Sequence, residues 1–530
     1  MLLGVAMTAL LVPCSALAHG KHGHQSSGGA TTNGLPLSVP TWKLLPTTSR
    51  SHPFGGDAWS NRGVGLAKHG FVEEEYLVSG DARVYQSVPK SDYVAKVINQ
   101  SHYTTRAIVR RPRDMRTWSG NVLVEYMNVS DGLDLQIVWS KLHDQIFSDR
   151  DVYIAFTGKG NVIPVLQRFD PDRYGDLEMP NPVPPDQQAC GTLPDDPGYD
   201  PGHAPSKLYE NGLIYDMWSG IGLLLKSGSS PLGRPARRLY ATGQSQSANA
   251  LVNYYSWFGG TRTTVGREPV YDGVFAETPT DRTLLPVRLS IMVHGALNQC
   301  SPPLPEEDPQ LAVPDRGTPF FSVNSQWDAW KSVQPPSRHF RNWQVAGANH
   351  VDRQQYDHIY PIPGDVAKSG AAGPDALPWQ VGIPLELYSP AGWFCDDTNR
   401  PEVGLPQAQQ MAWYWLKRWA TQGKQPPVAP YLTRSAPGGP LVLDSDGNAL
   451  GGLRMPYIQT PIAKYTGVLW GDCAEAQVPF TPERLAQLYP THEAYVQQVA
   501  AAARDLVRGG FLHPDDATDI VDRAEDRPVP

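Results

Sequence analysis

The sequence has few charged residues and no concentrated basic segment. Charged side chains make up 18% of the 530 residues, and the formal net charge is −8. Nucleic-acid binding requires a concentrated basic surface, so we expect no nucleic acid partner. Beyond residue 18, no stretch reaches the roughly 18 consecutive apolar residues of a spanning helix, so no membrane span is predicted.

Cysteine is also scarce. Apart from Cys14, the chain contains Cys190, Cys300, Cys395 and Cys473. Their spacings are far too wide for a zinc knuckle, and we predict neither a metal site nor a cofactor. An oxidising compartment would permit one or two disulfides among these four residues, and the sequence leaves their connectivity open.

The N-terminus carries a targeting pattern. Residues 1–18 are apolar and end in Ala16-Leu17-Ala18, although no lysine or arginine precedes the apolar run. This pattern predicts a signal peptide that is cleaved before His19, and therefore a secreted or periplasmic protein. Residues 19–40 begin rich in glycine, serine and histidine and are expected to form a flexible leader.

Strands and helices alternate along the chain from about residue 120. Residues 120–128 form a near-continuous apolar run, which suits a central strand buried on both faces. Apolar residues recur at helical spacing over 131–148, and residues 151–156 are typical of the next strand. The order predicts an α/β fold with a mostly parallel central sheet flanked by helices.

The segment 237–247 combines a short strand, a tight turn and the start of a helix. Ser245 lies at the tip of the turn, with Gly243 two positions before it and Ser247 two positions after it. Small residues are required at both places, because larger side chains would collide across the turn. This is the pattern of a nucleophile elbow, and Ser245 is the candidate nucleophile.

Two later segments supply an acid and a histidine. Asp328 follows a predicted buried strand over 318–325, and His350 follows another short strand and a small-residue turn. The chain order serine, acid, histidine is the one that the α/β-hydrolase fold requires. Glu277, at the end of the strand after the elbow strand, is the alternative acid.

The candidate oxyanion hole combines two backbone amides. One is the N–H of Gln246, which follows the proposed nucleophile directly. The other is expected in the loop after the strand 122–127, which indicates Asn128 or Val129. A capping or turn role is the alternative for Asn128.

These motifs resemble the exported proteins of the α/β-hydrolase fold known as alpha/beta hydrolase domain proteins, and the similarity spans nearly the whole mature chain. The segments that carry it are 103–106, 124–129, 170–175, 243–247, 345–350 and 451–457. The resemblance implies serine hydrolase activity without naming a substrate. Gln326 departs from it, because family members often carry glutamate there, and this favours Asp328 as the acid.

The expected organisation is a catalytic domain over 41–478 followed by a helical extension over 479–530, with helix breaks at Pro490 and Gly509–Gly510. Residues of about 164–205 are dense in proline, aspartate and glycine and are predicted to form a lid-like insertion.

The predicted function is hydrolysis of a small-molecule or polymer-derived carboxylic ester through an acyl-enzyme. The alternatives are an amidase or peptidase with the same triad, and a catalytically silent binding protein of the same fold. The substrate and the oligomeric state stay open.

Overall fold

A computed structural model describes most of the chain. The described residues are 38–129, 132–184, 208–262, 268–279, 308–329, 334–352, 360–370, 403–467 and 476–529, with Pro36, Gln187, 295–298 and Leu304. The predicted signal peptide, most of the leader and the four cysteines of the mature chain lie outside these residues.

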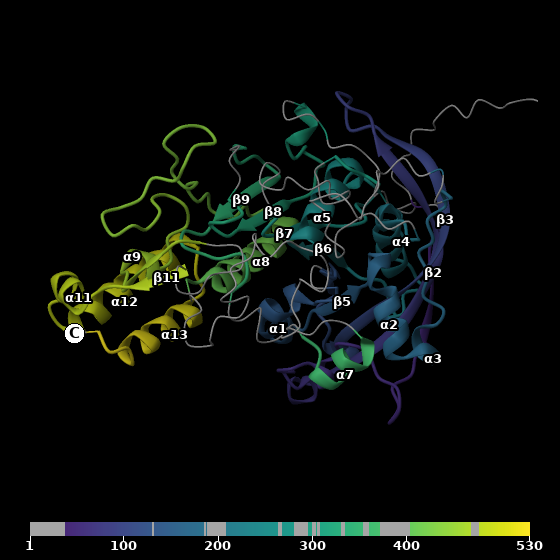
Figure 1. Cartoon of the computed structure of the whole chain (residues 1–530), viewed down its shortest axis with the longest axis horizontal. Coiled ribbons are helices and arrows are strands. Elements are labelled where there is room, and N and C mark those ends of the chain that lie inside the picture. Colours follow the sequence, from purple (N-terminus) through teal and green to yellow (C-terminus); the bar gives the residue numbers. More distant parts are fainter. Residues whose placement is uncertain are drawn as a thin grey trace, which may run out of the picture.

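A nine-stranded sheet organises the molecule, in the order β1-β2-β3-β5-β4-β6-β7-β8-β9 (Figure 1). The six strands from β5 to β9 in this order run parallel to one another. The three other strands join antiparallel at the β5 edge. The strands of the sheet are β1 (Thr41–Leu45), β2 (Phe71–Ser87), β3 (Ala95–Pro112), β4 (Asn121–Tyr126), β5 (Val152–Phe156), β6 (Arg238–Gln244), β7 (Gly273–Glu277), β8 (Phe320–Asn324) and β9 (Phe340–Gln344).

Helices flank both faces of this sheet. The described helices are α1 (Ile137–Asp149), α2 (Ile163–Phe169), α3 (Pro171–Tyr174), α4 (Ile214–Leu225), α5 (Gln246–Phe258), α7 (Pro363–Ser369), α8 (Leu405–Gln422), α9 (Pro456–Gln459), α11 (Pro482–Leu488), α12 (His492–Gly509) and α13 (Pro514–Glu525). A small separate ribbon pairs β10 (Ala463–Tyr465) with β11 (Gln477–Pro479). The predicted α/β class with a mostly parallel sheet is confirmed.

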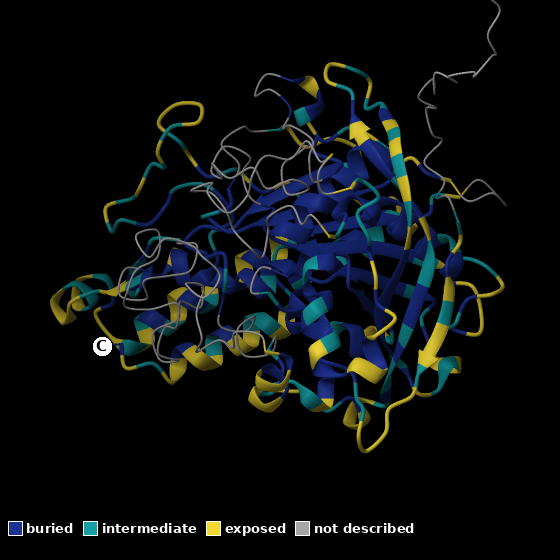
Figure 2. Cartoon of the chain, turned by 45° about the vertical axis from the view of Figure 1, so that its right-hand side comes forward, coloured by how far each residue is buried: buried dark blue, intermediate teal, exposed yellow. Residues whose placement is uncertain are grey.

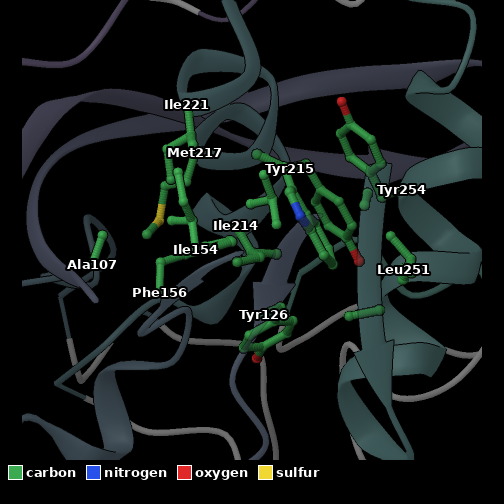
Figure 3. Close-up of a cluster of buried hydrophobic side chains, with 14 of the residues drawn as sticks. Ala107, Tyr126, Ile154, Phe156, Ile214, Tyr215, Met217, Ile221, Leu251 and Tyr254 are labelled. Atoms are coloured by element: carbon green, nitrogen blue, oxygen red, sulfur yellow. The ribbon is translucent and has the colours of Figure 1, made fainter. Parts of the chain in front are cut away.

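Two apolar layers hold the helices on the sheet, because alternate side chains of a strand point to opposite faces. In β4, Val122 and Val124 belong to the cluster that includes α4 and α5, whereas Leu123 belongs to the cluster that includes α1 and α8. Figure 2 shows the central strands buried throughout. Figure 3 shows part of the first layer, where Ile214 and Met217 of α4 lie among side chains of the central strands. The sheet is therefore covered on both sides, as expected for parallel strands.

The C-terminal helices lie toward the β9 end of the sheet, opposite the long β2–β3 hairpin (Figure 1). Breaks separate them near Pro490 and at Gly509–Gly510, where the sequence predicts them. Trp343 of β9 contacts Phe511, with ring centroids 5.2 Å apart. Trp415 of α8 donates a hydrogen bond to the carbonyl of Gly510 at 2.7 Å. These contacts join the helices to the core of the sheet domain.

Two expected elements differ from the structure. The first part of the segment predicted to form an insertion is helical, because α2 and α3 occupy it, and residues 188–205 of that segment lie outside the described residues. Pro164 and Pro171 each occupy the first turn of a helix, where the missing N–H costs nothing. The helix predicted from residue 131 begins instead at Ile137, since Leu135 still pairs with Asn128 in an antiparallel bridge. Prolines in this segment therefore indicate the starts of helices as well as loops.

Within the described part of the chain, no helix combines the length and apolar character needed to cross a bilayer.

Candidate active site

Ser245 occupies a strained turn between β6 and α5. Its backbone angles are φ 55° and ψ −119°, outside the regions that a non-glycine residue favours. A Cβ atom on Gly243 would lie 2.9 Å from the backbone of Ser247, so only glycine fits there. The Ser247 hydroxyl donates to the carbonyl of Gln244 at 2.7 Å and holds the turn closed. The structure therefore has the elbow geometry expected from the sequence.

Asp328 and His350 lie side by side at the ends of β8 and β9. Nδ1 of His350 is 2.9 Å from each carboxylate oxygen of Asp328. A carboxylate only accepts hydrogen bonds, so Nδ1 carries the proton of this contact and Nε2 is the basic nitrogen. The Ser325 hydroxyl also donates to Asp328, at 2.5 Å. Both side chains of the pair are almost fully buried.

Nε2 of His350 faces the side chain of Gln244. Its distance from Nε2 of Gln244 is 3.4 Å, and no hydrogen bond to the Ser245 hydroxyl is present among the described contacts. Contacts between a nucleophile and its base are often loose before substrate binds.

The loop that carries His350 is held by Gln326. Its side-chain oxygen accepts a hydrogen bond from the amide of Gly347 at 2.8 Å, and its nitrogen donates to the carbonyl of Thr466 at 2.5 Å. A glutamate could accept the first bond but could not donate the second. Glutamine at position 326, where family members often carry glutamate, therefore makes two hydrogen bonds that a glutamate could not both make.

Glu277, the alternative acid, has another partner. Its Oε2 lies 3.4 Å from Nζ of Lys141, a fully buried lysine of α1. Burial raises the pKa of Glu277 to about 7, against the opposing charge of Lys141. Its backbone carbonyl accepts the amide of Ser245 at 3.0 Å. The side chain of Glu277 is thus paired away from His350, and its main chain supports the elbow.

The two candidate oxyanion donors after β4 differ in their bonding. The amide of Asn128 donates to the carbonyl of Leu135 at 3.0 Å, so this N–H is already engaged. The side chain of Asn128 instead donates to the carbonyl of Gln244 at 3.1 Å and to its side-chain oxygen at 2.9 Å. Asn128 therefore links the loop after β4 to the elbow, and the amide of Val129 is the remaining candidate in this loop.

Gln246 connects the elbow to a lysine that the sequence patterns did not select. The side-chain nitrogen of Gln246 donates to Asn128 Oδ1 at 3.2 Å. Nζ of Lys159, at the end of β5, donates to Gln246 Oε1. The sequence did contain one signal for Lys159. The residue stands between two glycines shortly after β5, and binding sites form at the carboxyl ends of parallel strands.

A buried ionic network supports the loops beneath the site. Arg106 of β3 is fully buried and bonds to Glu75 at 2.9 Å and to Asp134 at 2.8 Å. Arg173 and Tyr174 of α3 reach the same Glu75, at 2.5 Å and 2.9 Å. Two segments that carry the family resemblance, 103–106 and 170–175, therefore share one network, although they lie far apart in the sequence.

No group of three or more metal-ligating side chains is present in the described residues. The turn over 444–448 superficially resembles a calcium loop, but its acids bond to arginines. Asp444 lies 2.8 Å from Arg454, and Asp446 lies 2.5 Å from Arg484.

Solved structures that resemble part of this chain include three esterases. A glucuronoyl esterase from Solibacter usitatus is 8% identical, with a TM-score of 0.26, over 55% of this chain and 70% of that one. A carboxylesterase from Lactobacillus plantarum WCFS1 is 8% identical, with a TM-score of 0.24, over 46% of this chain and 72% of that one. Acetyl xylan esterase 1 from Thermoanaerobacterium sp. JW/SL YS485 is 10% identical, with a TM-score of 0.25, over 56% of this chain and 80% of that one. Similarity at this level carries no argument about function.

No curated protein matches the chain. A family model described as "Alpha/beta hydrolase domain" matches residues 37–522, which is most of the sequence. The match includes the elbow, the Asp328–His350 pair and the Arg106 network described above. The chain belongs to the alpha/beta hydrolase domain family.

Proposed function

We propose that the protein is an exported serine hydrolase that cleaves carboxylic esters through a Ser245–His350–Asp328 triad. The observation that carries the proposal is the combination of a strained Ser245 with a histidine whose Nδ1 is bound to Asp328. Strain of this kind places a side chain at a functional position, and a carboxylate that accepts from Nδ1 makes Nε2 the nitrogen that accepts a proton.

In the first half-reaction, Nε2 of His350 takes the Ser245 proton as Oγ attacks the ester carbonyl carbon. For this step Nε2 exchanges its long contact with Gln244 for the serine hydroxyl. The tetrahedral intermediate then collapses, the bond to the alcohol oxygen breaks, and His350 returns the proton to that oxygen. Asp328 stabilises the imidazolium in between.

In the second half-reaction, His350 removes a proton from water, which attacks the acyl carbon. The bond from that carbon to Ser245 Oγ then breaks, His350 returns the proton to Oγ, and the carboxylic acid leaves. The amides of Gln246 and Val129 are the proposed oxyanion donors, and Gln246 also begins α5. A helix N-terminus favours negative charge, so this amide suits an oxyanion. The proposed nucleophile is 8% exposed, consistent with a recessed site.

The test is labelling with a fluorophosphonate, followed by mass spectrometry of the modified peptide. We expect a single adduct on Ser245 and none in Ser245→Ala. Labelling elsewhere, or no labelling of the folded protein, would contradict the elbow assignment. A parallel assay with a 4-nitrophenyl ester and the matching anilide separates an esterase from an amidase, and silence in every assay would favour a binding protein.

A further inference from the structure

Lys159 is a buried lysine whose hydrogen-bond partner, Gln246, directly follows the proposed nucleophile. Its side chain follows β5 and is 1% exposed, and its Nζ donates one hydrogen bond, to Oε1 of Gln246. Throughout the described residues, no carboxylate lies within ion-pair distance of this Nζ. An ammonium group has three donors, and here only a neutral amide receives one of them.

Other inward-facing lysines of this chain have carboxylate partners. Lys141 lies 3.4 Å from Glu277, Lys226 lies 2.9 Å from Asp272, and Lys417 lies 2.8 Å from Asp151. Removing a charge from water without a counter-charge is costly, so a buried ammonium group is normally paired. The described environment of Lys159 lacks the partner that the other three have.

The backbone around Lys159 keeps it in place. A Cβ atom on Gly158 would lie 2.4 Å from Cδ1 of Ile214, and one on Gly160 would lie 2.4 Å from Cβ of Tyr209. The amide of Gly160 also donates to Oδ1 of Asn211 at 3.1 Å. The chain is therefore packed tightly on both sides of Lys159, and this packing keeps its side chain in the protein interior.

The position of Lys159 relates it to the chemistry. Strands β4, β5 and β6 are parallel neighbours, so Lys159 and Ser245 follow strands that end at the same edge of the sheet. The partner of Lys159, Gln246, follows Ser245 directly and contacts Asn128. A counter-charge for Lys159 would lie beside the scissile ester.

We propose that Lys159 binds a carboxylate of the substrate, and that the enzyme acts on esters carrying an anionic group near the scissile bond. This inference rests on the proposed function and names its substrate class. Half-esters of dicarboxylic acids and esters of hydroxy acids have the required chemistry. Burial lowers the pKa of Lys159 to about 7, and a bound carboxylate favours its charged form.

The first test uses matched ester pairs. Mono-4-nitrophenyl adipate and 4-nitrophenyl adipamate differ by a carboxylate on the acyl side, and 4-acetoxybenzoate and 4-acetoxybenzamide differ on the alcohol side. We expect kcat/KM to favour the carboxylate in at least one pair by about tenfold or more, the effect of one charge-assisted hydrogen bond. No preference in either pair would overturn the inference.

The Lys159→Met variant tests the residue itself, because methionine has a similar length and no charge. We expect it to lose the preference, with a larger loss of kcat/KM on the carboxylate ester than on its neutral partner. An equal loss on both members would assign Lys159 a structural role. Lys417→Met is the matched control: it removes a lysine that pairs with carboxylates, and we expect lower thermal stability with the preference unchanged.

A binding measurement separates this inference from the proposed function. Calorimetry with Ser245→Ala compares monomethyl adipate with methyl adipamate for the acyl side, and 4-acetoxybenzoate with 4-acetoxybenzamide for the alcohol side. Tighter binding of a carboxylate member, lost in Ser245→Ala/Lys159→Met, supports the anion site even if no ester is hydrolysed. Equal binding overturns the anion site even if Ser245 is labelled by a fluorophosphonate.

Discussion

The backbone carbonyl of Glu277 accepts the amide hydrogen of Ser245 at 3.0 Å. This bond continues the parallel pairing of β6 with β7, in which Gln244 lies opposite Glu277. The strained serine is therefore anchored to the neighbouring strand at the point where its own strand ends. The side chain of the same glutamate pairs with Lys141 beneath the site.

Replacement of the proposed nucleophile separates chemistry from folding. We expect Ser245→Ala to lose about 10³-fold or more of kcat, because the group that forms the acyl-enzyme is absent. The melting temperature should change little, since alanine occupies the same strained turn and only one oxygen is lost. Turnover rates and thermal unfolding of both proteins check this, and near wild-type turnover would refute the elbow assignment.

The assignment of Asp328 as the acid and the assignment of Glu277 predict different effects of mutation on kcat. Asp328→Asn should lose about 10³–10⁴-fold in kcat, because the amide cannot hold the required tautomer of His350 or stabilise its cation. Glu277→Gln should keep far more of kcat and mainly lower stability, since it leaves Lys141 with less counter-charge. Steady-state kinetics of the two variants decide between them, and the reverse order would make Glu277 the acid.

Arg106 should be a major contributor to stability. Arg106→Leu leaves Asp134 without its cation and removes one of two arginines from Glu75, so we expect a loss of about 3–5 kcal/mol in the free energy of unfolding. Arg116→Leu is the control, since Arg116 pairs with Asp114 on the surface and solvent screens that pair. Urea unfolding measures both, and equal effects would argue against the buried network.

Substrate preference should depend on pH through Lys159. Its pKa of about 7 in the free protein means that its charge is present below this pH and is lost above it. The ratio of kcat/KM for the carboxylate ester to that for its neutral partner should therefore fall as the pH rises through about 7. The ratio cancels any effect of pH that acts equally on both esters. A ratio that stays constant from pH 6 to about 9 would contradict this assignment.

The pH dependence of thermal stability is an independent test of Lys159. The folded-state pKa lies below the unfolded value of 10.5, so the penalty of burying the cation is full below about pH 7 and disappears as the pH approaches 10.5. Lys159→Met should therefore be no less stable than the wild type at pH 6, and its relative advantage should shrink by pH 9. Melting curves at both values test this, and a lower melting temperature at pH 6 would indicate a structural lysine.

Local sequence determined the elbow and the chain order of the candidate triad. Five consecutive residues suffice for the elbow, because the collision that requires Gly243 involves Ser247, only four positions away. The near-continuous apolar run of β4 likewise specified a strand buried on both faces, since burial pattern is a property of neighbouring residues. The same reasoning located the breaks between the C-terminal helices.

Tertiary structure alone decided which groups meet. Asp328 and Glu277 both lie at or just beyond the end of a strand, and the fold places His350 against Asp328 and Lys141 of α1 against Glu277. The bridge from Asn128 to Leu135 removed one oxyanion candidate through a backbone bond that no side-chain pattern reports. Lys159 met Gln246 because their strands end at one edge of the sheet, and contacts across a sheet leave no periodic signal in the chain.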